Sequence, residues 1–306
     1  MNLFENLTNM ISGSPYLFGT FFFLFGTIVA SFFNVVILRY PKVLDYESSL
    51  EVKDWFEEKD IPIPEELNKF EKLSLSFPAS HCYSCHTPLK WYHNIPIFSY
   101  LFLKGKCGHC NAPISIQYPI IEFLGGLIML FSYSYFMPMG LMYFIFGSIF
   151  LMSLYVSLSI DFKSLLLPDG ITYFLLWSGL LLSVFDFSFI HLSLKESILG
   201  AIVGYLLCRI TSDLAKLIKG YPMMGDGDLK LLAMLGVFVN IKGSVFTFFT
   251  APFFGIVTWV IFKLMKTKEP QIPYGPSLIF SSLFYILFPS YIPEVITQIL
   301  SLIPTF

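Results

Sequence analysis

The feature that most constrains this chain is its series of apolar runs, each about long enough to cross a lipid bilayer. A transmembrane helix needs about 20 consecutive, mainly apolar residues, and such runs recur along most of the 306-residue sequence. The chain is 55% hydrophobic and only 13% charged, whereas soluble domains are about 25% charged. The sequence therefore predicts an all-α integral membrane protein.

About eight transmembrane helices are expected. The sixth is short for a full span, and two prolines interrupt the eighth. The first run is expected to be retained, because the residues before it lack the basic region of a cleavable signal. The expected helices cover residues 16–38, 118–136, 139–160, 170–189, 195–217, 229–241, 243–263 and 277–302.

The basic residues predict how these helices are oriented. With the N-terminus outside, all but Lys195 and Lys242 of the 19 Lys and Arg residues fall in inner segments. Because cytoplasmic loops of membrane proteins are enriched in Lys and Arg, we expect both termini outside and the long loop inside. The expected domains are a first transmembrane helix (1–38), a cytoplasmic loop between helices 1 and 2 (39–117) and a second membrane domain (118–306).

The first part of this loop, from Asp45 to Glu71, is strongly acidic. We interpret it as a solvated helical insert. An alternative is that its charge attracts basic peptide substrates, since a field of one sign raises the local concentration of oppositely charged ligands.

Four of the five cysteines form two Cys-x-x-Cys pairs in the second part of the loop. They are Cys82, Cys85, Cys107 and Cys110. Four thiolates suit a tetrahedral structural zinc site, and a cytosolic loop keeps thiols reduced. The sequence predicts that zinc folds this loop without taking part in catalysis. The flanking histidines His81, His86 and His109 are alternative ligands, although four cysteines already complete the site. Cys208, inside an apolar run, is expected to be a core residue.

Two carboxylates lie at membrane boundaries on the same expected side. Asp161 ends the third run, and Asp228 opens the sixth run after Gly225-Asp226-Gly227. Ionisable residues at membrane depth are candidates for functional sites. Two carboxyl groups that share a proton can hydrolyse a peptide bond, because one activates water while the other polarises the carbonyl. The glycines are expected to allow a backbone geometry closed to other residues.

Other readings of the acidic residues stay open at this point. Asp226 adjoins Asp228, and spacing does not exclude it from the catalytic role. Asp169 follows Pro168 and is expected to start the fourth helix, where an acid is stabilised by the helix dipole. Intramembrane acid pairs also form proton relays in transporters.

The whole chain resembles the prepilin peptidases, the GxGD aspartic leader peptidases of type IV pilus and type II secretion systems. The matching boxes run in family order from residue 26 to residue 276. They are Gly26 with Ser31-Phe32-Phe33-Asn34-Val35-Val36 and Arg39-Tyr40-Pro41, Trp91-Tyr92-His93-Asn94-Ile95-Pro96, Tyr118-Pro119 with Glu122, Ile160-Asp161 with Leu167-Pro168-Asp169 and Trp177, Gly225-Asp226-Gly227-Asp228-Leu229-Lys230-Leu231, and Pro273-Tyr274-Gly275-Pro276.

The resemblance implies that Asp161 and Asp228 are the catalytic pair. Gly225, Gly227, Asp226, Asp169 and Lys230 are then supporting residues, and residues 118–306 are the peptidase domain. It implies cleavage of type IV prepilins or pseudopilins at the cytoplasmic face of a bacterial inner membrane. It also implies N-methylation of the new terminus with S-adenosylmethionine, whose binding residues the sequence does not identify.

The expected partners are prepilins, the pilus or type II secretion assembly machinery and membrane lipid, with no nucleic acid. Three alternatives remain at the sequence level. They are a peptidase without methyltransferase activity, a proton-coupled transporter, and a zinc-bearing scaffold for pilus assembly.

Overall fold

A computed structural model describes residues 14–69, 73–185, 187, 189, 192–264 and 273–288. The secondary structure in these ranges is helical, apart from two isolated β-bridges. The chain divides into two compact units, Met1–Val156 and Ser157–Phe306. Each unit is described by itself. The functional division that the sequence suggests, at residues 38 and 117, stays a prediction.

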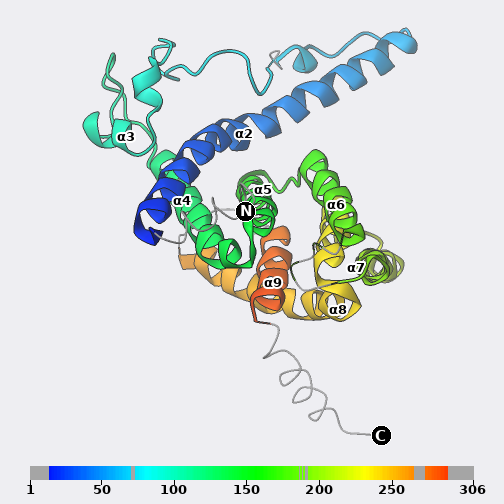
Figure 1. The fold of residues 1–306 in the computed structure, drawn as a ribbon. Coiled ribbons are helices and arrows are strands. Elements are labelled where there is room, and N and C mark those ends of the chain that lie inside the picture. Colours follow the sequence, from blue (N-terminus) through cyan, green and yellow to red (C-terminus); the bar gives the residue numbers. More distant parts are fainter. Residues whose placement is uncertain are drawn as a thin grey trace, which may run out of the picture. The chain divides into compact units, whose positions relative to one another are not determined.

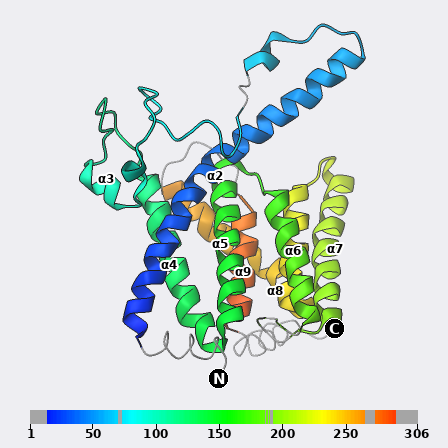
Figure 2. The ribbon, with the colours of Figure 1, turned by 45° about the horizontal axis from the view of Figure 1, so that its top comes forward.

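The first unit is built on two long helices that lie side by side, α2 and α4 (Figures 1 and 2). A polar segment connects them, and α5 begins in this unit and ends in the second. The bounds are α2 Pro15–Glu58, η1 Glu65–Lys69, η2 Trp91–Asn94, α3 Phe98–Phe102, α4 Gln117–Phe136, η3 Met137–Met139 and α5 Leu141–Ser164.

Small residues allow α2 and α4 to approach closely. A Cβ added to Gly26 would lie 2.6 Å from the Met129 Cβ and 2.7 Å from the Gly125 carbonyl oxygen. Helices in lipid have no hydrophobic driving force to associate and depend on such close packing. The opposite face of α2 exposes large apolar side chains, including Phe21 and Phe32. Gly26 is therefore a helix-packing residue, and the exposed face of α2 suits lipid.

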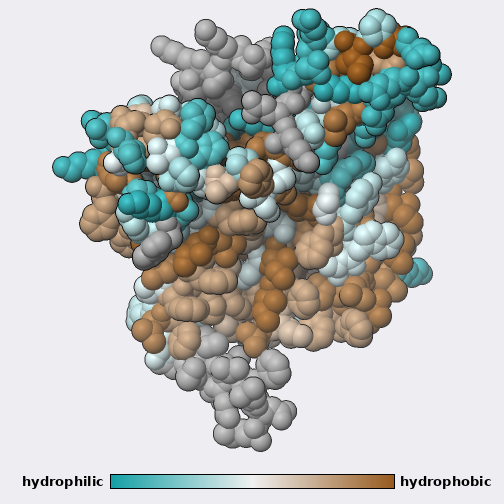
Figure 3. Space-filling view, turned by 90° about the horizontal axis from the view of Figure 1, so that it is seen from above, coloured by the Kyte–Doolittle hydropathy of each residue, from teal (hydrophilic) through white to brown (hydrophobic). Residues whose placement is uncertain are grey.

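The first helix does not end at residue 38 but continues to Glu58. The apolar run ends where the membrane ends, whereas residues 42–58 include several good helix formers that carry the same helix onward. The beginning of the acidic insert is therefore helical, as predicted, and part of α2. In Figure 3 the polar side chains (teal) gather over this end of α2 and the segment that follows it. Glu71 lies outside the described residues.

In the second unit three helices, α6, α7 and α9, pack against α8 (Figure 2). Residues 231–239 of α8 are buried without interruption. The hydrophobic core of this unit therefore surrounds the helix that begins with the Gly-x-Gly-Asp box. The bounds are α6 Asp169–Val184, α7 Leu194–Lys219, α8 Asp226–Leu264 and α9 Gly275–Leu287.

Glycines bring α7 and α8 together, as they do α2 and α4. A Cβ on Gly200 would collide with the Gly236 carbonyl oxygen, and one on Gly204 would lie 2.6 Å from the Leu232 carbonyl oxygen. The pair Gly200 and Gly204 has the small-xxx-small spacing of closely packed membrane helices. This contact holds α7 against the start of α8.

The sixth and seventh expected helices form one element, α8, with a break between them. Asn240 has φ 59° and ψ −171°, and its side-chain oxygen accepts a hydrogen bond from the Gly243 N–H at 3.1 Å. Asparagine tolerates positive φ better than most residues, and this contact caps the following helical turn. The predicted boundary at residue 242 is thus a kink at Asn240.

Within the described residues, five helices have the length and hydropathy to cross a membrane. They are α2, α4, α5, α7 and α8, while α6 and α9 are shorter apolar helices. The chain is therefore an all-α, multi-pass membrane protein, as the sequence predicts. The part of the eighth expected helix beyond residue 288 lies outside the described residues.

Candidate active site and metal centre

Asp161 lies in the last turn of α5 and is almost fully buried, with 4% of its surface exposed. Its Oδ2 atom has no hydrogen-bonding partner among the described residues. A buried polar atom without a partner is costly, so this arrangement calls for a ligand, water or substrate group. Asp161 therefore has the environment of a reactive carboxyl group.

Asp228 lies in the first turn of α8 and is half-buried. Its Oδ2 accepts a hydrogen bond from the Gly225 N–H at 3.3 Å, while its own N–H donates to the Gly225 carbonyl at 3.1 Å. These two hydrogen bonds hold the Asp228 carboxyl group against Gly225, the first residue of the Gly-x-Gly-Asp box. Asp161 feels the charge of Asp228, so the two carboxyl groups interact electrostatically.

Leu167 and two glycines bring the segments of this site together. A Cβ on Gly227 would lie 3.2 Å from the Leu167 Cβ, and one on Gly275 would lie 2.5 Å from the Asp161 Oδ2. The same Cβ on Gly275 would lie 3.2 Å from the Leu167 Cδ2. The start of α9 therefore closes over Asp161 because residue 275 has no side chain.

The expectation of an unusual backbone at Gly225 and Gly227 was wrong. Neither has the positive φ that Gly105, Gly140 and Gly220 adopt. At Gly227 the requirement is steric, because a larger residue would press on Leu167.

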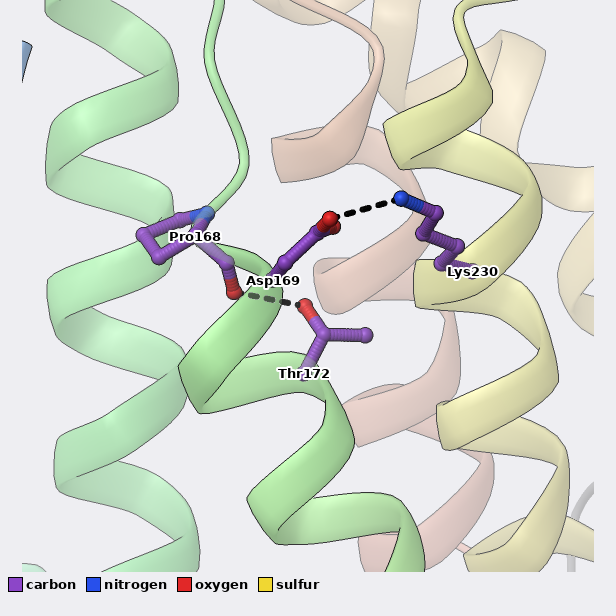
Figure 4. Close-up of polar contacts among 4 residues, drawn as sticks. All are labelled: Pro168, Asp169, Thr172 and Lys230. Atoms are coloured by element: carbon purple, nitrogen blue, oxygen red, sulfur yellow. Dashed lines mark hydrogen bonds and ion pairs between the residues drawn. The ribbon is translucent and has the colours of Figure 1, made fainter. Parts of the chain in front are cut away.

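Asp169 and Lys230 form an ion pair between α6 and α8 (Figure 4). Asp169 begins α6, as predicted, and its Oδ2 accepts a hydrogen bond from the Lys230 Nζ at 2.7 Å. The Thr172 hydroxyl donates to the Pro168 carbonyl oxygen at 3.1 Å and steadies the same turn. The pair joins the first turns of α6 and α8, and both side chains are partly exposed.

The remaining acid of the box, Asp226, is exposed at the beginning of α8. Two residues that were not predicted to belong to the site, Tyr274 and Cys208, lie close to it. Burial, with the nearby Cys208 and Asp228, raises the pKa of the Tyr274 hydroxyl, which stays protonated at neutral pH. Cys208 is fully buried, as predicted for a core residue, but lies within electrostatic reach of Asp228. Tyr274 could have been identified from the sequence, because it lies in the Pro-Tyr-Gly-Pro box that resembles the family.

In the first unit, four cysteines form a metal centre. The sulfur atoms of Cys82, Cys85, Cys107 and Cys110 all lie within 4.8 Å of one another. Hydrogen bonds with the hydroxyl group and backbone of Thr87 lower the pKa of Cys85 to about 6. Burial and the neighbouring thiols raise the pKa of Cys110 to about 11, so a bound metal would be needed to keep all four sulfur atoms in the thiolate form. The four residues are arranged to hold a metal ion.

The two cysteine pairs are built as copies of one turn. The N–H of Cys82 donates to the Thr87 carbonyl oxygen at 3.0 Å, and that of Cys107 donates to the Ala112 carbonyl oxygen at 2.8 Å. The residue after each pair, His86 or Asn111, has positive φ. Each turn thus presents two sulfur atoms to the same point. The described metal-binding group contains cysteines only, so the flanking histidines are not part of it.

The fold and these two sites define a class: a multi-pass membrane protein with paired aspartates at helix ends and a four-cysteine module. Two family models match the chain in this order. The bacterial peptidase A24 N-terminal domain matches residues 24–136, and the type IV leader peptidase family matches residues 148–260. The chain belongs to the type IV leader peptidase family.

Relatives with the same organisation cover most of the chain. A prepilin leader peptidase/N-methyltransferase of Klebsiella pneumoniae is 37% identical over 74% of this chain and 87% of its own length. Proteins of the same description from Dichelobacter nodosus and Neisseria gonorrhoeae are 36% and 33% identical. These matches cover 85% and 83% of this chain, and 88% and 84% of the relatives. No solved structure matches the chain.

Proposed function

We propose that this protein cleaves the leader peptide from type IV prepilins or pseudopilins and uses Asp161 and Asp228 as its catalytic pair. The observation that carries this proposal is the convergence of the segments that bear the two aspartates: Gly275 lies against the Asp161 carboxyl group and Leu167, and Leu167 also lies against Gly227 in the box of Asp228. One carboxylate removes a proton from water, and the water oxygen attacks the scissile carbonyl. The other carboxyl group, protonated, donates to that carbonyl oxygen. The C–N bond then breaks, and the released amine takes up a proton.

Five further residues of the predicted site support this pair. Gly225 donates a hydrogen bond to Asp228, and Gly227 leaves room for Leu167. Lys230 and Asp169 tie α8 to α6. Asp226 is exposed at the mouth of the same box and has a supporting role.

The second proposed activity is N-methylation of the amine that cleavage exposes. It rests on the relatives, which are described as prepilin leader peptidase/N-methyltransferases over most of this chain. S-adenosylmethionine supplies the methyl group. Zinc at the four cysteines folds the loop, since a complete set of four thiolates leaves no open position for substrate.

We infer that the protein resides in a bacterial inner membrane with both termini outside and the cysteine module in the cytoplasm. The concentration of basic residues on one side supports this orientation. Residues 1–38 and 39–117 then form the first transmembrane helix and the cytoplasmic loop, and residues 118–306 form the peptidase domain. The assembly machinery of pili or type II secretion and membrane lipid are the proposed partners.

Intact-mass measurement tests both activities at once. Detergent-purified protein is mixed with a prepilin and S-adenosylmethionine, and the product is weighed. We expect a product that lacks its leader and carries one additional methyl group. Cleavage without methylation would restrict the protein to peptidase activity. Folded protein that leaves an authentic prepilin uncut would contradict the proposed function.

Removal of the ion pair at the start of α8 is expected to have a small effect. In Lys230→Met the pair with Asp169 is lost, but both side chains are partly exposed. Exposed ion pairs contribute about 0–1 kcal/mol. We expect leader cleavage within a few-fold of wild type and a slightly lower thermal unfolding midpoint. Asp169→Asn is the matched variant, and a loss of cleavage as large as that of a catalytic substitution would assign Lys230 to the chemistry.

A further inference from the structure

A cavity of about 370 Å³ lies in the first unit and has no role in peptide hydrolysis as described above. Small-molecule sites typically measure about 300–1,000 Å³. Its walls come from α2, from the start of α4 and from the cysteine module, including two of the metal-binding cysteines. The polar and aromatic side chains of its lining include Ser31, Asn34, Tyr83, Tyr100, Tyr118 and Glu122.

The cavity contains a buried carboxyl group. Glu122 is 8% exposed and, within the described part of the chain, forms no ion pair. Its Oε2 accepts a hydrogen bond from the Ile97 N–H at 2.7 Å, and the Ser31 and Asn34 side chains favour its charged form. Neutral donors orient a carboxylate but do not cancel its charge. A cationic ligand would compensate it.

Arg39 also lines the cavity, but its guanidinium group is hydrogen-bonded to backbone carbonyl groups. Its Nη2 donates to the Pro78 carbonyl oxygen at 2.7 Å, and its Nη1 donates to the Ser74 and Leu75 carbonyl oxygens at 3.3 Å each. The guanidinium group therefore ties α2 to the segment leading into the cysteine module. It holds the wall of the cavity in place and, within the described residues, forms no ion pair with Glu122.

A second residue of the cavity, Asn34, has a side-chain oxygen without a hydrogen-bonding partner among the described residues. Asn34 is 3% exposed, and its Nδ2 donates to the Tyr118 carbonyl oxygen at 3.2 Å. Its Oδ1 has no hydrogen-bonding partner among the described residues. A buried acceptor in this state is costly, and a donor on a bound ligand would remove that cost. Glu122 and Asn34 together make a built, polar binding site.

We propose that this cavity binds S-adenosylmethionine, with the Glu122 carboxylate facing the positively charged sulfonium. The inference rests on the proposed methylation, and it identifies the site of the methyl donor. The tyrosines of the wall offer faces on which an adenine ring can stack. The hydroxyl and amino groups of the donor provide hydrogen-bond donors for Asn34.

The transfer balances without any further reactant. The amine nitrogen attacks the methyl carbon, the N–C bond forms as the C–S bond breaks, and the electron pair stays on sulfur. S-adenosylhomocysteine leaves as a neutral thioether, and the amine loses a proton to solvent. Glu122 therefore attracts the donor more strongly than the product, because the sulfonium charge disappears in the reaction.

Glu122 also has a structural role that the test must separate from ligand binding. Ile97 has φ 62°, which is rare for a β-branched residue. The hydrogen bond to Glu122 helps to hold this strained turn. Glu122→Gln keeps an oxygen that can accept from Ile97, removes the charge and replaces the other oxygen with an NH2 group. Ser31→Leu leaves Glu122 in place and fills part of the cavity.

Calorimetric titration of the full-length, zinc-containing protein in detergent tests the proposal. For Glu122→Gln we expect the Kd for S-adenosylmethionine to rise at least about tenfold, because the contact with its charged sulfonium is lost. The Kd for S-adenosylhomocysteine, whose sulfur is neutral, should change by less than about threefold. Ser31→Leu should weaken binding of both compounds. Leader cleavage and zinc content are measured in the same samples and should match wild type.

Unchanged donor affinity in both variants would overturn the site. Equal weakening of both compounds in Glu122→Gln would overturn the placement of the sulfonium. A raised KM for the pilin with unchanged donor affinity would show that the cavity holds the substrate amine instead. Wild-type protein that cleaves but never methylates would refute the proposed methyltransferase activity itself, which separates that failure from a failure of this inference.

Discussion

Asp161→Asn and Asp228→Asn are each expected to abolish leader cleavage. General acid–base catalysis contributes about 10²–10⁴-fold per positioned group. An asparagine can neither take a proton from water nor give one to the carbonyl oxygen, so either substitution removes one of the two functions. We expect cleavage to fall by at least about 100-fold. The measurement is the rate of leader release, followed by gel or mass spectrometry.

The matched controls lie in the same two segments. Asp226→Asn changes an exposed acid two residues from Asp228, and we expect it to keep most of the cleavage. A mature pilin supplied without its leader should still be methylated by Asp161→Asn, which would show that the protein is folded. Loss of cleavage in Asp226→Asn with full activity in Asp228→Asn would reassign the catalytic acid of the box.

Removal of the metal from the four-cysteine module is expected to abolish methylation and to affect cleavage much less. The free energy of binding a structural zinc is about 10–16 kcal/mol at pH 7, and this energy holds the two turns of the module together. Cys82 and Cys107 also line the proposed donor cavity, so that wall is lost with the metal. The two aspartates, by contrast, belong to the other unit.

Cys107→Ser and chelator-treated wild-type protein provide two routes to the metal-free state. We expect about one zinc per chain in the wild type by elemental analysis, less in Cys107→Ser, and faster proteolysis between residues 80 and 115. Cys208→Ala is the matched control for zinc content, because Cys208 lies outside the cluster. Methylation at the wild-type rate by metal-free protein would show that the module is not required for that activity. Absence of zinc from native protein would overturn the metal assignment.

Several parts of this fold can be read from local sequence. A bilayer demands a long apolar run for each crossing helix, so α4, α5 and α7 lie close to their predicted positions. The start of α6 was also predicted, because Asp169 follows Pro168 and an acid is stabilised at the start of a helix. The Cys-x-x-Cys spacing predicts the metal cluster, because two residues between cysteines form one turn around a metal.

Other features depend on side chains that are far apart in the sequence. Hydropathy marks where lipid ends, not where a helix ends, so the continuation of α2 to Glu58 was missed. The break in α8 was placed only approximately, because it depends on Asn240 capping the next turn. The cavity around Glu122 had no local signal, since α2, α4 and the cysteine module each contribute part of its wall.

By itself, the sequence determined that this is a polytopic membrane protein with a four-cysteine module and two aspartates at helix ends. Those are properties of short segments, set by hydropathy and by the spacing of a few residues. The tertiary structure alone decided that Gly275 and Leu167 close over Asp161 and that Glu122 is buried with no ion pair among the described residues. Both depend on how separate helices pack, and packing is decided by contacts between residues that no local pattern relates.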